Sequence, residues 1–215
     1  MNKTAIMALL ICTAVFAQQK GSFTDPRDGR KYKYTTIGRQ IWMAENLNYA
    51  GKNDEIGVCY DKKPENCEKY GALYTWKEAE KICPEGWHLP SKDEWEALLE
   101  FAGGTGIAGK KLIAKGIWKE AEKKKECKYT TKDTTGRGKV IVTEHDECVT
   151  DEFGFSALPV GGYIAGAFKN AGAGCCWWST FTKEENYRWC VDSEGKMDGN
   201  FAMWSYLFSV RCLKN

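Results

Sequence analysis

The sequence predicts one exported α+β domain of about 190 residues, and three observations lead to this fold class. Two segments begin with Thr or Ser followed three residues later by Glu, the pattern that starts a helix. Segments in which apolar and polar residues alternate between turn residues predict short strands before and after these helices. Ten cysteines favour disulfides, because so many thiols are unusual in a reducing compartment.

Residues 1–17 predict a signal peptide. A lysine near the start supplies positive charge, Ala5–Phe16 is almost entirely apolar, and Ala17 precedes the expected cleavage point. Cleavage removes Cys12 and leaves nine cysteines, so at most four disulfides can form within the chain. The alternative is a lipoprotein signal ending at Cys12, although Ile11 stands where that signal needs a small residue. We expect an extracellular or cell-envelope location and no membrane span after cleavage.

The first elements expected after the signal peptide are strands. Residues 21–44 predict a β-meander, because Tyr32, Tyr34 and Thr36 alternate with polar residues and turns lie on both sides. Residues 45–70 are rich in Asn, Gly and Asp, and they predict a loop.

Two capping boxes then predict two helices. The first helix follows Thr75, has its apolar face at Trp76, Ala79 and Cys83, and ends at Pro84. The second follows Ser91. Its apolar face consists of Trp95, Leu98, Leu99 and Ala102, and Gly103-Gly104 ends it. A further short helix is expected within residues 106–115.

The second half of the chain predicts irregular β-structure. Residues 119–150 hold a lysine run, a Gly-rich turn and a strand-like segment, which together predict a charged hairpin. Residues 153–215 are rich in Gly and aromatics, and they predict short strands separated by turns. Residues 192–200 look like a calcium loop, but Lys196 occupies its third ligand position and the twelfth position lacks Glu. We therefore expect a hairpin turn there.

The charge balance excludes one class of partner. Lys and Arg total 31 against 29 Asp and Glu, so the net charge is only +2. A protein that binds the phosphate backbone of nucleic acid usually has a clear basic excess. We therefore expect no nucleic-acid partner.

Several ordered strings closely resemble the Fibrobacter succinogenes major paralogous (FISUMP) domain over residues 21–215. They are DG at 28–29, IGRQIWMAENLN at 37–48, CY at 59–60, YGALYTW at 70–76, CPEGWHLPS at 83–91, GFSALP at 154–159, WWST at 177–180 and SVRC at 209–212. Residues 119–150 look like an insertion in that pattern. More distantly, GWHLPS and the C-terminal SVRC are similar to strings of formylglycine-generating-enzyme-like proteins. That resemblance implies a C-type-lectin-like fold, with two helices on small irregular antiparallel sheets and the termini close together.

The cysteines are expected to act as structural crosslinks. Local spacing favours Cys59 with Cys67, and it favours Cys127 with Cys148 across the base of the inserted hairpin. A bridge between Cys83 and Cys212 is implied by the resemblance to C-type-lectin-like folds. Cys190 is expected to pair with Cys175 or Cys176, which leaves one free thiol; a vicinal Cys175–Cys176 disulfide is the alternative.

The sequence predicts no catalytic residue, metal site or cofactor. His88 lies between apolar residues at a turn, which favours a hydrogen-bonded structural role, and His145 lies in the inserted segment. The enzyme alternative is a formylglycine-generating-like copper oxidase. It would need two reactive cysteines facing a groove, and the active-site strings of that family do not align here.

Aromatic side chains provide the remaining functional observation. Five of them are candidate ligand-binding residues, because flat rings can pack against sugars. They are Tyr187, Tyr206, Trp189, Trp204 and Trp178, of which Tyr187 and Tyr206 are expected to be the more exposed. The expected function is noncatalytic binding of a plant-wall polysaccharide or a surface protein. The polysaccharide is suggested by these rings and by the resemblance to a family named for a fibre-degrading bacterium. A purely structural envelope protein is the other alternative.

Overall fold

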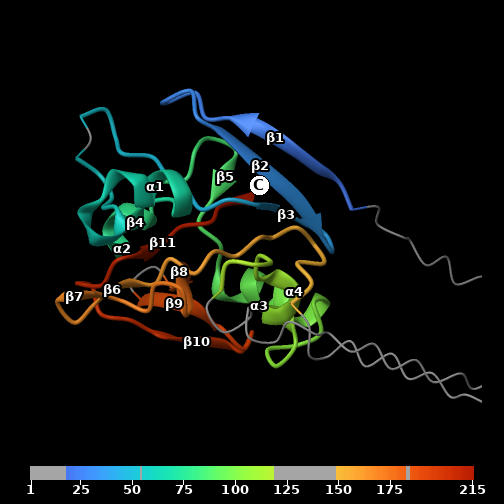
Figure 1. Cartoon of the computed structure of the whole chain (residues 1–215). Coiled ribbons are helices and arrows are strands. Elements are labelled where there is room, and N and C mark those ends of the chain that lie inside the picture. Colours follow the sequence, from blue (N-terminus) through green and yellow to red (C-terminus); the bar gives the residue numbers. More distant parts are fainter. Residues whose placement is uncertain (1–17, 54, 119–148, 183–184) are drawn as a thin grey trace, which may run out of the picture.

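A five-stranded sheet contains both ends of the described chain. The computed structural model describes residues 18–53, 55–118, 149–182 and 185–215. Its first sheet has the order β1-β2-β3-β12-β5 (Figure 1). The strands are β1 (Lys20–Thr24), β2 (Lys31–Ile37), β3 (Gln40–Met43), β5 (Trp87–His88) and β12 (Leu213–Lys214). Strands β1 to β3 form the predicted antiparallel meander.

A second five-stranded sheet has the order β10-β9-β8-β11-β4, and a separate hairpin pairs β6 with β7. Strand β11 runs parallel to β8, whereas the other pairs in this sheet are antiparallel. The strands are β4 (Leu73–Tyr74), β6 (Gly162–Ile164), β7 (Ala167–Lys169), β8 (Gly174–Thr182), β9 (Glu185–Asp192), β10 (Met197–Phe201) and β11 (Phe208–Ser209). The chain is therefore mixed α+β, with mostly antiparallel pairing.

The helices begin at the predicted caps. In α2 (Trp76–Ala79) and α3 (Lys92–Phe101), the cap residue and the Glu at the third helical position exchange hydrogen bonds as a capping box. The predicted apolar face of α3 is buried, and its Trp95 ring lies 5.5 Å from the ring of Trp177 on β8. The short helix expected within 106–115 is α4 (Ala108–Leu112).

Two expectations about helices were wrong. The segment 64–70 forms helix α1 (Pro64–Tyr70) behind the 3₁₀ turn η1 (Tyr60–Lys62), although a loop was expected. Pro64 favours this start because it occupies the first helical turn, where its missing N–H costs nothing. Helix α2 ends at Ala79 and does not continue to Cys83. Beyond it, the Ile82 carbonyl accepts a hydrogen bond from Arg27, and Cys83 is bound to Cys212.

The core lies on both faces of strand β8. Because side chains alternate along a strand, Trp177 and its neighbour Trp178 enter different hydrophobic clusters. The Trp177 indole N–H donates to Asn46 Oδ1 at 2.9 Å, and that of Trp178 donates to the Tyr74 carbonyl at 2.7 Å. Both buried rings therefore have a hydrogen-bond partner as well as apolar contacts.

A buried arginine joins the segments that meet at this core. Arg211 is fully buried, and its Nε and Nη2 donate to Asn46 Oδ1 at 3.1 and 2.8 Å. Its Nη1 donates to the Phe155 carbonyl, and its Cζ lies 4.2 Å from the centre of the Phe155 ring. Among the described residues, no carboxylate forms an ion pair with it. Burial lowers the pKa of Arg211 to about 10, so the guanidinium remains charged at neutral pH.

Three disulfides lie within the described ranges. Cys59–Cys67 and Cys83–Cys212 are the pairs expected, and Cys190 bonds Cys176. The proposed Cys127–Cys148 pair, His145, the signal peptide and most of the inserted hairpin lie outside the described residues. Every helix that the structure describes is too short or too polar to cross a lipid bilayer.

Removal of the Cys83–Cys212 bridge should lower the free energy of unfolding by about 5 kcal/mol, because among the described disulfides this crosslink closes the longest loop and so restricts the unfolded chain most. The same change at Cys59 and Cys67, only 8 residues apart, should cost about 2.5 kcal/mol. Urea unfolding of the double Ala variants, followed by Trp fluorescence, measures both. Equal losses would contradict this order.

Replacing Arg211 by Met should lower the free energy of unfolding by about 2–4 kcal/mol, because it leaves buried acceptors on Asn46 and Phe155 without their charged donor. Arg211→Lys should lose a similar amount, since one ammonium cannot replace the planar set of donors. The matched control is Arg30→Met, which breaks the exposed Arg30–Glu68 pair and should cost less than about 1 kcal/mol. The same urea titration compares them, and a smaller loss at Arg211 than at Arg30 would refute the role assigned to Arg211.

Candidate functional site

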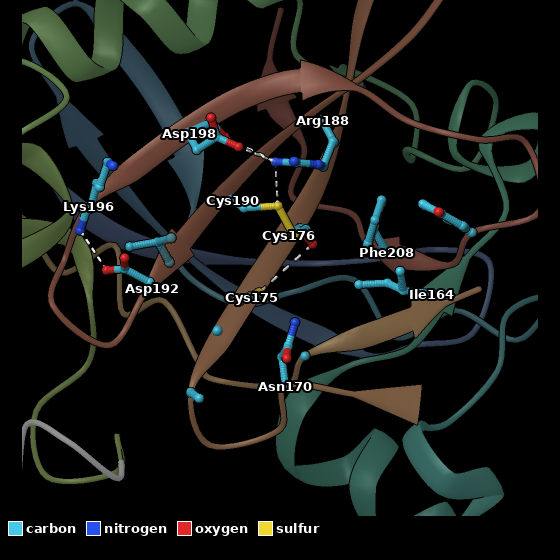
Figure 2. Close-up of a pocket in the computed structure, with 15 residues that line it drawn as sticks. Ile164, Asn170, Cys175, Cys176, Arg188, Cys190, Asp192, Lys196, Asp198 and Phe208 are labelled. Carbon is cyan, nitrogen blue, oxygen red and sulfur yellow. Dashed lines mark hydrogen bonds and ion pairs between the residues drawn. A yellow bond between two sulfur atoms is a disulfide. The ribbon is translucent and has the colours of Figure 1, made fainter. Parts of the chain in front are cut away.

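A pocket of about 520 Å³ opens over the second sheet, beside the Cys176–Cys190 disulfide (Figure 2). Its walls come from strands β6 and β8 to β11 and from the segments that join them. The apolar part includes the disulfide, Ile164, Tyr206 and Phe208. A volume of this size is typical of small-molecule sites.

Strand register brings the polar lining together. Cys176 on β8 pairs with Cys190 on β9, and Cys190 pairs with Asp198 on β10. These three side chains therefore share one face of the sheet in a row. Arg188 lies two residues before Cys190 and so projects from the same face.

Arg188 forms the main polar contact in the pocket. Its Nη1 lies 3.0 Å from Asp198 Oδ2 and 2.8 Å from Cys190 Sγ (Figure 2). The side chain is only 20% exposed, whereas that of Asp198 is 59% exposed. The arginine is therefore held against the disulfide by a carboxylate on the neighbouring strand.

The predicted hairpin turn borders the same pocket. Asp192 Oδ1 accepts hydrogen bonds from the backbone N–H groups of Glu194 and Lys196, at 3.0 and 2.9 Å. Gly195 has φ +78°, a conformation that glycine adopts readily. This carboxylate oxygen therefore closes the turn between β9 and β10.

The free thiol lies away from the disulfide. Cys175 is the one described cysteine outside a disulfide, and it is buried in the cluster that contains Trp177. Burial raises the pKa of the Cys175 thiol to about 12, against smaller opposing effects of Arg211 and Ser209. A neutral, buried thiol is a poor nucleophile.

Three of the five candidate aromatics are buried, which corrects the expectation for Tyr187 in particular. Trp178 packs against Phe208 with ring centres 4.8 Å apart. Trp189 and Tyr187 belong to the cluster on the opposite face of the sheet, with exposures of 5% and 9%. The remaining two differ from them. Trp204 is 52% exposed, and the half-buried Tyr206 lines the pocket.

The sequence reasoning missed Arg188 and Asp198. Their approach depends on pairing between β9 and β10, which composition does not reveal. The sequence predicted a turn over residues 192–200, which includes Asp198; only the narrower turn that the structure shows at 192–196 pairs Cys190 with Asp198. Alternation then places Arg188 on the same face.

His88 has two hydrogen-bonding partners. Its Nδ1 lies 2.6 Å from Asn215 Oδ1, and its Nε2 lies 3.0 Å from Glu94 Oε1. These contacts connect β5 to the start of α3 and to the C-terminal residue, as expected for a structural histidine. In the ranges that the structure describes, no three His, Cys, Asp or Glu side chains are grouped in a way that could hold a metal ion.

Iodoacetamide at pH 8 should leave Cys175 unmodified in the native protein, because a pKa of about 12 leaves about one thiol in ten thousand ionised. Unfolding in urea should allow rapid modification. Peptide mapping by mass spectrometry follows this one cysteine in both states. Native alkylation as fast as that in urea would contradict the assigned burial.

Comparison with known proteins identifies the family. Residues 35–214 match the model of the Fibrobacter succinogenes major domain. No curated protein and no solved structure matches the chain. Strand β1 lies before the matched range and pairs with β2 at the edge of the first sheet. Because the match covers most of the 215 residues, the chain belongs to the Fibrobacter succinogenes major domain family.

Proposed function

We propose that this chain is an exported, noncatalytic binding domain that recognises a plant-wall polysaccharide at the pocket beside Cys176–Cys190. The observation that carries this proposal is the combination of an apolar wall with polar groups at one open pocket. The half-buried Tyr206 offers ring surface above the buried Phe208, while Arg188 and Asp198 offer a donor and an acceptor at the same site. Sugar rings present C–H faces and hydroxyls together, so they suit such a lining.

Trp204 extends this candidate surface. The Tyr206 N–H donates to the Met203 carbonyl at 3.0 Å, so a tight turn holds Trp204 just before the pocket wall. Its ring lies 6.5 Å from the buried Trp76 ring, which supports one side of it. An exposed tryptophan supported in this way suits stacking on a sugar.

The proposed fold is C-type-lectin-like. Both ends of the described chain lie in the first sheet, which supports the expected closeness of the termini. The Cys83–Cys212 bridge joins the segment after α2 to the chain just before β12, as the resemblance implies. These features agree with that fold.

Export also belongs to this proposal. Three disulfides are consistent with an oxidising environment outside the cytosol. The expected signal peptide at residues 1–17 would deliver the chain there, to the envelope or the medium.

The copper-oxidase alternative has less support. It requires two reactive thiols at one groove, whereas within the described residues the single unpaired cysteine is buried with a raised pKa. Binding of a surface protein is supported by the exposed Phe201 and Met203. It is the alternative that a failure of glycan binding would favour.

Trp204→Ala and Tyr206→Ala should each weaken polysaccharide binding by roughly tenfold, because each removes a ring from the binding surface. Isothermal titration with soluble xylan and mixed-linkage glucan, together with pull-down on cellulose, measures the binding. The matched control is Phe101→Ala, which removes an equally exposed ring at the end of α3, outside the pocket.

The control should bind as the unmodified protein does. If the unmodified protein binds none of these glycans, polysaccharide recognition is refuted. If all three variants bind equally well, the proposed position of the site is refuted.

A further inference from the structure

The Cys176–Cys190 disulfide has two features that neither of the other two described disulfides combines. It lines an open pocket, and a guanidinium contacts one of its sulfurs. We propose that it is a site of thiol–disulfide exchange with low-molecular-weight thiols, in which Cys176 is attacked and Arg188 stabilises Cys190 as the leaving thiolate. This inference does not rest on polysaccharide binding.

The fold does not depend on this disulfide for the arrangement of its strands. Strands β8 and β9 already pair along most of their length, from Gly174–Asp192 to Thr182–Glu185. The crosslink joins two positions within that ladder and spans only 14 residues, compared with 129 for Cys83–Cys212. Its cleavage would therefore leave the paired strands and the long-range bridge in place.

Accessibility distinguishes it from Cys83–Cys212. Cys176 and Cys190 are both half-buried at the pocket, whereas Cys212 is fully buried. A pocket of about 520 Å³ admits a small thiol. Exchange requires an attacking thiolate to reach one of the sulfurs, and this disulfide meets that requirement.

Arg188 makes the exchange directional. Its Nη1 lies 2.8 Å from Cys190 Sγ, and Asp198 holds the same nitrogen at 3.0 Å. A nearby cation lowers the pKa of a thiol, and a thiol of lower pKa is the better leaving group. Cys190 should therefore leave, and the incoming sulfur should bond Cys176.

The other pocket disulfide lacks this contact. Cys59–Cys67 borders a cavity of about 650 Å³ that also contains Arg30. There the guanidinium pairs with Glu68 through bonds of 3.0 and 3.2 Å. Among the described residues, no basic side chain donates a hydrogen bond to the sulfurs of Cys59 and Cys67. This disulfide is therefore an internal control.

The reaction conserves charge and electrons. A thiolate RS⁻ attacks Cys176 Sγ, so that a new S–S bond forms to Cys176 while the Cys176–Cys190 bond breaks. Its electron pair leaves on Cys190 as a thiolate beside Arg188. A second RS⁻ attacks the outer sulfur of the mixed disulfide, which releases RSSR and a Cys176 thiolate. The two external thiolates together lose two electrons as they form RSSR, and the protein disulfide gains these two electrons.

Cys175 is not the resolving thiol. It follows Gly174 on β8 and faces the core, on the opposite side of the strand from Cys176. The second step therefore uses an external thiol.

The test treats the purified protein with reduced glutathione, quenches early with acid, and maps each cysteine by alkylation and mass spectrometry. We expect Cys176–Cys190 to react before Cys59–Cys67 and Cys83–Cys212, with glutathione attached to Cys176. Arg188→Gln should slow the first step by roughly threefold to tenfold, because it removes the charge that stabilises the leaving sulfur. Arg188→Lys should restore part of the rate.

Arg30→Gln is the matched control, and it should leave the rate at Cys176–Cys190 unchanged. Earlier reaction of Cys59–Cys67, attachment of glutathione to Cys190, or an unchanged rate in Arg188→Gln would each overturn the proposal. The site of attachment is measured on the unmodified protein, so it decides the matter even if the Arg188 variants do not fold.

Discussion

The buried positive charge of Arg211 is the constraint on which the other parts of this structure depend. A charge in the core is tolerated only when its donors are satisfied, and here the acceptors are neutral. Asn46 Oδ1 accepts from both Arg211 and Trp177, while the Phe155 carbonyl and ring contact the same guanidinium. Four segments that are distant in sequence therefore contact one another at this guanidinium, through Asn46, Phe155, Trp177 and Arg211 itself. These contacts fix strand β8 within the core.

The position of β8 determines what each of its faces can do. One face carries Cys175 and Trp177 into the core around Arg211, and the other carries Cys176 and Trp178. Pairing with β9 and β10 then aligns Cys190 and Asp198 with Cys176. The pocket lining is thus set by the register of β9 and β10 against β8, which the core holds in place. Cys175 is a buried free thiol and Cys176 forms a disulfide at the pocket, because the two adjacent cysteines lie on opposite faces of β8.

Local signals in the sequence predicted local structure well. The caps at Thr75 and Ser91 and the alternation in residues 21–44 lie within a few residues of the elements that they specify. Helix α1 was missed because its composition resembles a loop, with Pro64 as the clearest indication of a start. The burial of Tyr187 and Trp189 was not predictable, since it depends on which face of β9 packs against distant α3 and α4 residues. Of the candidate site, Tyr206 and the Cys190 pairing were anticipated, whereas the Arg188–Asp198 contact required the register.

The core face of β8 is held independently of the disulfide on its pocket face. Hydrogen exchange of the Trp177 indole N–H, measured by NMR before and after selective reduction of Cys176–Cys190, tests it most directly. That N–H donates to Asn46 within the Arg211 network. The protection of this N–H should be retained after reduction, while signals from residues that line the pocket shift. Loss of the Trp177 protection on reduction would contradict it.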